Sequence, residues 1–204
     1  RGVPKNETET VKWYRKAAEQ GVAIAQNRLG EMYYHGLGIP KNDVKALRWY
    51  LKAANQDYAD AQLNLGLMHA RGEGVPKNDA EAFNWYRKAA NQGFANAQYY
   101  LGMMYADGEG VPENDAEAVK WYLKAANQGH ASAQMNLGGM YIQGEGIPTD
   151  VTKAYNWWSV AKAQGHKKAA FNLDSLKNVM TKEQISEGQA LATKCWESQF
   201  QDCD

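Results

Sequence analysis

Hydrophobic and polar positions recur along this 204-residue chain with a period of 36 residues. Within one period, residues 58–93, apolar residues return at steps of three and four in two separate stretches. In the second stretch Ala82, Trp85, Tyr86 and Ala89 fall on one side of a helix. The pattern therefore predicts two amphipathic helices in each period.

The period is marked by residues that are rare elsewhere in the chain. All five prolines and five of the seven tryptophans keep it: Pro4, Pro40, Pro76, Pro112, Pro148, Trp13, Trp49, Trp85, Trp121 and Trp157. A fixed period of this size is typical of repeat arrays, in which one unit stacks on copies of itself. We expect eleven helices, centred near residues 14, 29, 49, 65, 85, 101, 121, 137, 157, 173 and 190, and no sheet.

Helix ends are marked in the same regular way. Asparagine precedes the second helix of four periods as an expected N-cap, at Asn6, Asn42, Asn78 and Asn114. The loop Gly-x-Gly-x-Pro ends each first helix, because proline cannot continue a helix. A residue that tolerates the left-handed conformation ends each second helix, at Gly21, Asp57, Gly93, Gly129 and Gly165.

One further set of glycines lies inside the first helices, where glycine costs about 0.5–1 kcal/mol relative to alanine. This set is Gly30, Gly66, Gly102 and Gly138, and Asp174 takes the corresponding position in the last period. Because the cost is repeated in four periods, we expect a close helix crossing at each of these glycines. The alanines Ala25, Ala61 and Ala97 fit the same tight packing.

The charge balance narrows the classes of partner. Lys plus Arg equals Asp plus Glu at 23 each, so the formal net charge is zero. Nucleic-acid-binding domains carry a basic excess that neutralises phosphates, and we therefore expect no nucleic-acid partner. No apolar run approaches the roughly 18 residues of a membrane-spanning helix, and we expect no membrane span. The opening Arg1–Pro4 matches the middle of a repeat, so we expect the chain to begin inside the array.

The motifs Ala-x-Ala-Gln-x-x-Leu-Gly-x-Met-Tyr, Gly-x-Gly-x-Pro and Ala-x-x-Trp-Tyr-x-Lys-Ala-Ala resemble the Sel-one-like repeat (SLR), a relative of the tetratricopeptide repeat. The resemblance covers residues 2–174. It implies an all-α fold, a right-handed α/α superhelical solenoid of 36-residue helix-turn-helix repeats. It also implies that the Leu-Gly-x-Met-Tyr helices line the concave face. We expect the solenoid to occupy residues 1–180, with a C-terminal capping helix and tail in residues 181–204.

The resemblance also implies a non-catalytic scaffold or adaptor that binds a protein or peptide. Bacterial members of the family are often exported, so the expected location is periplasmic or secreted, with the cytoplasm as the alternative. A monomer is the default expectation. Some cysteine-rich SLR families are associated with weak β-lactam binding or hydrolysis, which is the alternative function.

Candidate chemistry is sparse, and we expect no enzyme, no catalytic residue, no cofactor and no metal. His35, His69, His130 and His166 are too scattered for metal-ligand spacing, and we expect structural or solvent-facing roles for them. We expect no acyl-enzyme machinery of the Ser-x-x-Lys type. The repeated methionines and Trp-Tyr pairs are interpreted as core residues and not as a cofactor or carbohydrate site.

The only two cysteines, Cys195 and Cys203, lie in the expected cap and its tail. Two free thiols are one interpretation. A tail that folds back on its helix would bring the pair within bonding reach, and paired cysteines close the C-termini of similar exported SLR proteins. We favour a disulfide, which in turn favours an oxidising compartment.

Comparing the repeats with one another suggests where a partner would bind. Positions that differ between copies have no shared packing task, and several fall on one side of the Leu-Gly helices. The residues expected to form the concave partner-binding face are Asn27, Glu31, Tyr34, Leu63, Asn64, Tyr99, Tyr100, Met103, Met135 and Phe171. Their mixture of aromatic, amide and apolar groups suits a peptide or loop. The alternative is that they are unconstrained surface positions.

Overall fold

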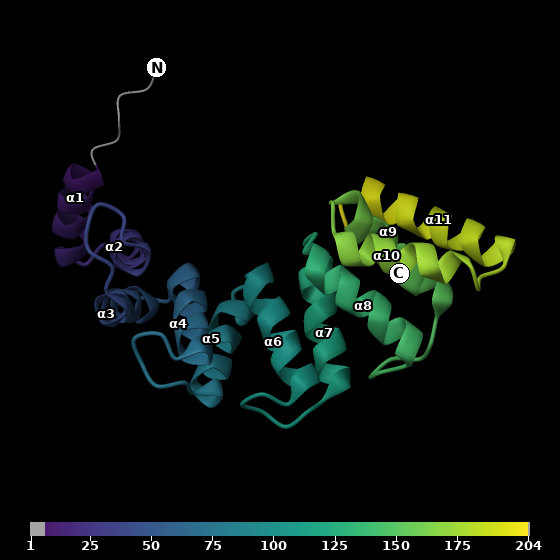
Figure 1. The fold of residues 1–204 in the computed structure, drawn as a ribbon, viewed down its shortest axis with the longest axis horizontal. Coiled ribbons are helices and arrows are strands. Elements are labelled where there is room, and N and C mark those ends of the chain that lie inside the picture. The colour runs from purple at the N-terminus through teal and green to yellow at the C-terminus, as the bar shows by residue number, and fades with distance from the viewer. Residues whose placement is uncertain (1–6, 204) are drawn as a thin grey trace, which may run out of the picture. The chain divides into compact units, whose positions relative to one another are not determined.

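A computed structural model describes residues 7–203 of the chain, and this part contains eleven α-helices and no strand (Figure 1). The first compact unit ends at Gln92 and the second begins at Gly93. The first unit contains α1 (Glu7–Glu19), α2 (Ala23–His35), α3 (Asp43–Ala54), α4 (Ala59–Arg71) and α5 (Asp79–Asn91). The second contains α6 (Ala95–Asp107), α7 (Asp115–Ala126), α8 (Ala131–Gln143), α9 (Val151–Ala163), α10 (Lys167–Lys177) and α11 (Lys182–Glu197). Every predicted helix centre falls in one of these helices.

The predicted helix ends are also found. Asn42, Asn78 and Asn114 cap α3, α5 and α7, and each side-chain oxygen accepts a backbone N–H three residues on, at 2.9, 3.1 and 3.0 Å. The predicted cap Asn6 lies outside the described residues. The first helices of the repeats are the even-numbered ones, and α2, α4, α6 and α8 end on glycines in the left-handed conformation. Asp57, after the second helix α3, adopts the same conformation with φ 59°. Local capping chemistry therefore sets the helix bounds.

The glycines inside the first helices admit an aromatic ring from the following helix. A Cβ placed on Gly30 would lie 2.6 Å from the Tyr50 ring, and one on Gly102 would lie 2.7 Å from the Tyr122 ring. Both tyrosines are buried. The expected close crossing is confirmed, and its cause is a tyrosine ring that lies directly on the glycine backbone.

The tryptophans of the repeat differ from the expectation that they form core. Trp85 and Trp121 are half-buried, and the Nζ atoms of Lys88 and Lys124 lie 4.2 and 3.9 Å from their ring centroids. The neighbouring tyrosine takes the inward direction, so the tryptophan lies on the outer side under a lysine stem. Trp157 in α9 is the fully buried copy, and there α11 packs along α9.

A second repeated contact uses buried glutamines. Gln62 in α4 donates from Nε2 to the Ala54 carbonyl at 3.3 Å and accepts from Gln92 Nε2 at 2.8 Å. Gln134 does the same with the Ala126 carbonyl at 3.1 Å and with Gln164 at 2.7 Å. In both cases the glutamine joins the helix before it to the end of the helix after it. Gln26, Gln62, Gln98 and Gln134 are all buried.

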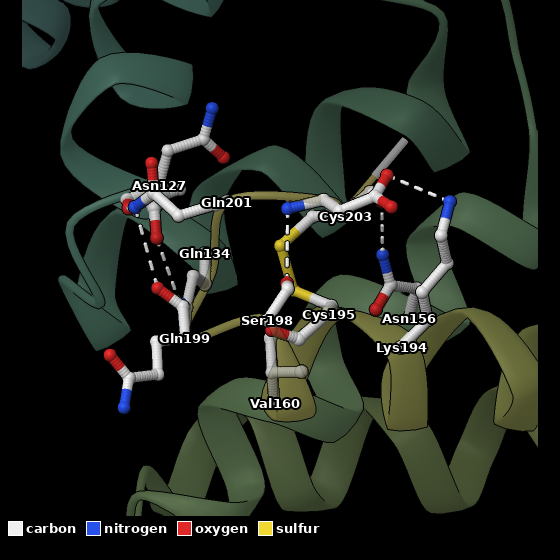
Figure 2. The surroundings of a disulfide bond; sticks show 12 residues. Asn127, Gln134, Asn156, Val160, Lys194, Cys195, Ser198, Gln199, Gln201 and Cys203 are labelled. Atoms are coloured by element: carbon white, nitrogen blue, oxygen red, sulfur yellow. Dashed lines mark hydrogen bonds and ion pairs between the residues drawn. A yellow bond between two sulfur atoms is a disulfide. The ribbon is translucent and has the colours of Figure 1, made fainter.

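The segment after α11 folds back on the second unit (Figure 2). Cys195 and Cys203 form a disulfide with an S–S distance of 1.94 Å, so the predicted bond is present in the structure. Asn156 Nδ2 in α9 donates to the Cys203 carbonyl at 2.7 Å, and this contact is buried. Gln201 Nε2 donates to the Asn127 carbonyl in the turn between α7 and α8, at 3.2 Å. The disulfide thus fixes a tail that contacts two earlier parts of this unit.

Candidate functional site

The first helices of the repeats carry the hollows considered as a site in each unit. In the first unit, α2 and α4 border a hollow of about 270 Å³. Its lining combines Tyr34, Asn64, Leu67, Met68 and Arg71 with Glu31, His35 and Tyr50. The lining of this hollow therefore contains both polar and apolar side chains.

The polar groups around this first hollow bond to one another. Asn27 Nδ2 donates to Glu31 Oε1 at 2.9 Å, and Asn64 Nδ2 donates to Asn27 Oδ1 at 3.2 Å. Arg28 forms an ion pair with the other oxygen of Glu31 at 2.7 Å. A partner that bound these groups would replace bonds already made within the protein, which lowers the net gain.

Tyr34 is held in the same way at the rim of this hollow. Its hydroxyl donates to Glu73 Oε2 at 2.7 Å, and Arg71 Nη1 donates to the hydroxyl oxygen at 3.4 Å. The bond to Glu73 raises the pKa of Tyr34 because it favours the protonated hydroxyl. Tyr34 is therefore a fixed hydrogen-bonding group and not a free aromatic anchor.

The second unit has two adjoining hollows of about 400 Å³ each along α8. One lies toward α6 and includes Asp107, Met135, Met140, Glu145 and Lys168 in its lining. The other lies toward α10, and its lining is Gly139, Ile142, Gln143, Trp158, Phe171, Asn172, Ser175 and Leu176. Gly139, Gln143 and Asn172 border both. Each of these hollows is larger than the one between α2 and α4, and the one toward α6 has Asp107, Glu145 and Lys168 in its lining.

Two of the residues predicted for the partner-binding face are not available to a partner. Asn27 is 2% exposed and Leu63 is 8% exposed. Both side chains are buried, so the expectation that they are surface contacts is wrong. Variation between repeats at this position reflects different local packing solutions.

Tyr99 is partly used for the same packing. Its ring stacks on His130, with centroids 4.5 Å apart, and lies 6.0 Å from the Tyr122 ring. Burial raises the pKa of Tyr99. Met135 is half-buried against the core of the same unit, and so is Met103. Tyr99 is primarily a contact between successive repeats.

The remaining predicted residues lie at or near the hollows. Glu31, Tyr34 and Asn64 line the hollow in the first unit. Met135 and Phe171 line those in the second, and Phe171 is 73% exposed. Tyr100 is half-buried on α6. Their role as partner contacts remains a prediction.

The structure adds rim residues that the sequence comparison did not select. The last helical position of successive first helices carries His35, Arg71, Asp107 and Gln143, and all four line a hollow. This position varies as strongly between repeats as the selected ones do. The sequence shows this variation, but it does not show that the end of the helix belongs to the same surface.

Two histidines have a structural role as helix caps. The Nδ1 atoms of His130 and His166 accept the backbone N–H groups of Ala133 and Ala169, each at 3.2 Å. Burial lowers the pKa of His130, because the charged imidazolium is poorly solvated there. Across the described residues 7–203, no group of three or more His, Cys, Asp or Glu is placed to hold a metal ion.

The sequence does contain one Ser-x-x-Lys motif, Ser159–Lys162, so the expectation of none was wrong. Ser159 Oγ is buried and has no hydrogen-bond partner. Lys162 Nζ forms an ion pair with Asp174 at 3.3 Å. A nucleophilic serine needs a base within hydrogen-bond reach and access to substrate. Ser159 lines a hollow beside α11, but its Oγ atom is buried and has no base within reach, so the motif does not form an acyl-enzyme site here.

None of the helices described between residues 7 and 203 combines the length and apolar character needed to cross a bilayer.

Comparison with known proteins places these features in a family. The family model described as Sel1 repeat matches residues 1–22, 23–58, 59–94, 95–130 and 131–166. These matches together cover well over half of the chain. No curated protein sequence matches it.

Solved structures share the fold. A protective antigen of uropathogenic Escherichia coli strains, described as displaying an SLR fold, is 32% identical with a TM-score of 0.85, over 97% of this chain and 42% of that one. A Sel1 repeat protein from Oxalobacter formigenes is 39% identical with a TM-score of 0.78, over 85% of this chain and 50% of that one. An immunity protein from Pseudomonas aeruginosa is 26% identical with a TM-score of 0.54, over 99% and 77%. This chain thus spans half or less of the length of the first two.

Proposed function

Because this chain belongs to the Sel1 repeat family, whose scaffold is typical of protein–protein interaction, we propose that it binds a partner protein through the first-helix surface of its second unit. The observation that carries the proposal is the pair of adjoining hollows along α8, with the exposed Phe171 ring at their edge. Exposed aromatic side chains beside a hollow are common anchors for a partner.

The second unit supports this role better than the first. Around the hollow of the first unit, Glu31, Asn27 and Tyr34 already bond to other residues of the chain. In the second unit two hollows adjoin along α8, and their linings include methionine, aromatic and amide side chains. A partner in the hollow toward α10 would bury apolar surface of Ile142, Phe171 and Leu176.

We also propose an extracytoplasmic location in a bacterium. The support is the Cys195–Cys203 disulfide, since such bonds persist in oxidising compartments, together with the bacterial origin of the similar structures. The similarity to an antigen and to an immunity protein fits a role in contact with other cells or their products.

Affinity capture with matched variants tests the binding surface. Phe171→Asp places a charge at the edge of the hollow, and Val179→Asp makes the same change at a residue 80% exposed in the turn after α10. We expect a protein captured from an extract of the native cells to be retained by the parent and Val179→Asp and lost with Phe171→Asp. Equal retention by all three proteins would show that the surface is wrong.

A chromogenic β-lactam assay tests the enzymatic alternative. Since the Ser159 Oγ atom is buried and lacks a base, we expect no saturable turnover. Turnover that survives stringent purification and disappears in Ser159→Ala would replace the scaffold proposal with an enzyme.

A further inference from the structure

Two consecutive glycines lie in the middle of α8, and only the first is explained by packing within the chain. At Gly138 the Trp158 indole occupies the space that a Cβ would need. At Gly139 the nearest atom to a Cβ would be Gln143 Oε1, at an ordinary contact distance of 3.7 Å. Alanine would fit there and would favour the helix, because glycine inside a helix is unfavourable.

The other repeats carry a side chain where Gly139 has none. The corresponding residues are Glu31, Leu67 and Met103, and the first two line the hollow of the first unit. The missing side chain leaves room on α8, and Gly139 borders both hollows of the second unit. Glycine in an otherwise regular element often marks a place where another backbone approaches closely.

The hollow toward α10 is suited to an apolar side chain. Ile142, Trp158, Phe171 and Leu176 line it. The amides of Gln143 and Asn172 stand beside Gly139, within both linings, and can donate to or accept from a main chain. An apolar cavity flanked by a few polar groups is typical of a peptide-binding site.

Charged residues of both signs line the hollow toward α6. Asp107 ends α6 and Glu145 follows α8, while Lys168 lies in the first turn of α10. Glu145 accepts a hydrogen bond from Gln143 at 2.9 Å. None of these three charges has an ion-pair partner among the described residues. The two carboxylates complement a basic side chain, and the lysine complements an acidic one.

We propose that an extended segment of the partner protein crosses α8 at Gly139, with its main chain against the glycine. One apolar side chain of the segment enters the hollow beside Phe171. A basic side chain lies at Asp107 and Glu145, and an acidic group points toward Lys168. This proposal rests on the proposed function and adds the position and the chemistry of the bound segment.

The test uses a random peptide library displayed on phage, selected against the parent protein. We expect enriched peptides to combine a basic residue, an apolar residue and an acidic residue or free carboxylate. Gly139→Leu fills the hollow and should weaken binding of those peptides by about tenfold or more, which corresponds to about 1.4 kcal/mol. Asp107→Lys should weaken the binding of peptides that carry a basic residue by a similar factor.

Stability measurements separate a binding glycine from a structural one. Gly139→Ala should leave the midpoint of thermal unfolding unchanged or raise it by about 1–4 °C, because the added methyl group makes only an ordinary contact with Gln143 and favours the helix. Gly138→Ala should lower the midpoint clearly, because the methyl group meets Trp158. A fall in the midpoint with Gly139→Ala would show a structural requirement for the glycine and overturn the proposal.

The binding outcomes distinguish the two proposals. Peptides that bind Gly139→Leu as tightly as the parent would overturn the Gly139 site and leave the scaffold function standing. No enrichment of any peptide by a folded parent protein would overturn the site, while the capture experiment with Phe171→Asp would still decide whether this face binds a whole protein.

Discussion

Buried amide side chains hold successive repeats together at the level of single residues. Gln62 and Gln134 are fully buried, and each bonds both to an alanine carbonyl of the preceding helix and to a later glutamine. A buried amide without partners would be costly, so this geometry explains why glutamine recurs where an apolar residue would otherwise be expected. The sequence showed the recurrence but not the bonding, because the partners lie 8 and 30 residues away.

Replacing one of these glutamines should destabilise the protein. Gln134→Leu removes the bonds to Ala126 and Gln164 and leaves the Ala126 carbonyl with the Gly129 N–H as its remaining donor. We expect a loss of about 1–3 kcal/mol in the free energy of unfolding, measured by urea denaturation. Gln189→Leu on the exposed side of α11 is the matched control and should change stability by less than about 0.5 kcal/mol. Equal effects of the two changes would contradict the role of the amide.

The cap formed by His130 predicts a pH dependence. Its Nδ1 must be unprotonated to accept the Ala133 N–H, and burial lowers the pKa of His130. The neutral form is therefore favoured in the folded state. The contribution of the His130 cap to folding stability is therefore complete above the ordinary histidine pKa of about 6.5. It is lost as the pH falls through the lowered pKa of His130 in the folded state.

Unfolding measured between pH 7.5 and pH 5 checks this. His130→Asn keeps a capping oxygen that does not titrate. We expect the variant to lose less stability than the parent across this range, by up to about 1 kcal/mol, the usual contribution of an N-cap. Parallel stability curves for the two proteins would show that the His130 cap does not respond to pH.

At the scale of helices, the two adjacent aromatic residues of a repeat have different roles in packing. The periodic pattern predicted the helices, their caps and the close crossing at the internal glycines. It did not show which of two adjacent aromatic residues points inward, because both Trp121 and Tyr122 fit the apolar side of α7. The structure assigns the inward position to Tyr122, above Gly102, and leaves Trp121 half-buried under Lys124.

Alanine substitution of the pair should reveal this division. Tyr122→Ala removes a buried ring and leaves a cavity over Gly102, so we expect a loss of about 3–5 kcal/mol. Trp121→Ala removes a ring that is partly solvated already, and we expect no more than about half that loss. The comparison requires only two denaturation curves. A larger loss of stability for Trp121→Ala than for Tyr122→Ala would show that the tryptophan is the main core residue of the pair.

The C-terminal cap shows a different limit of sequence analysis. The pairing of Cys195 with Cys203 was expected, but the contacts of the tail with Asn127 and Asn156 were not. Those contacts join residues 74 and 47 positions apart, and no local pattern specifies them. The tail is therefore held by long-range polar contacts in addition to the disulfide.

Reduction of the disulfide should loosen this cap. With the cysteines eight positions apart, the chain-entropy estimate of its contribution is about 2–3 kcal/mol. We expect reductant or Cys203→Ser to lower the midpoint of unfolding, and reductant to have no further effect on the variant. Intact-mass measurement after alkylation of protein from its native compartment should find no free thiols. Two freely alkylated cysteines would contradict both the bond and the extracytoplasmic location.

At the scale of the molecule, the repeats share one scaffold but present unequal surfaces. In the first unit the rim groups bond to one another around Glu31 and Tyr34. In the second unit Gly139 opens the surface between Asp107 and Phe171. Variation between repeats located the face in the sequence, but exposure depends on the neighbouring helix. For that reason Asn27 and Leu63 were wrongly assigned to the surface and Asp107 was overlooked.

Site-specific photocrosslinking in the cells that naturally make the protein tests the central claim most directly. A photoreactive amino acid at Gln143 or Asn172 lies beside Gly139, whereas one at Lys120 or Glu187 lies on an exposed part of α7 or α11. If the first-helix surface of the second unit binds the partner, Gln143 and Asn172 should yield the same covalent product and the two control positions should not. A product formed at Lys120 or Glu187 but absent from Gln143 and Asn172 would contradict that claim.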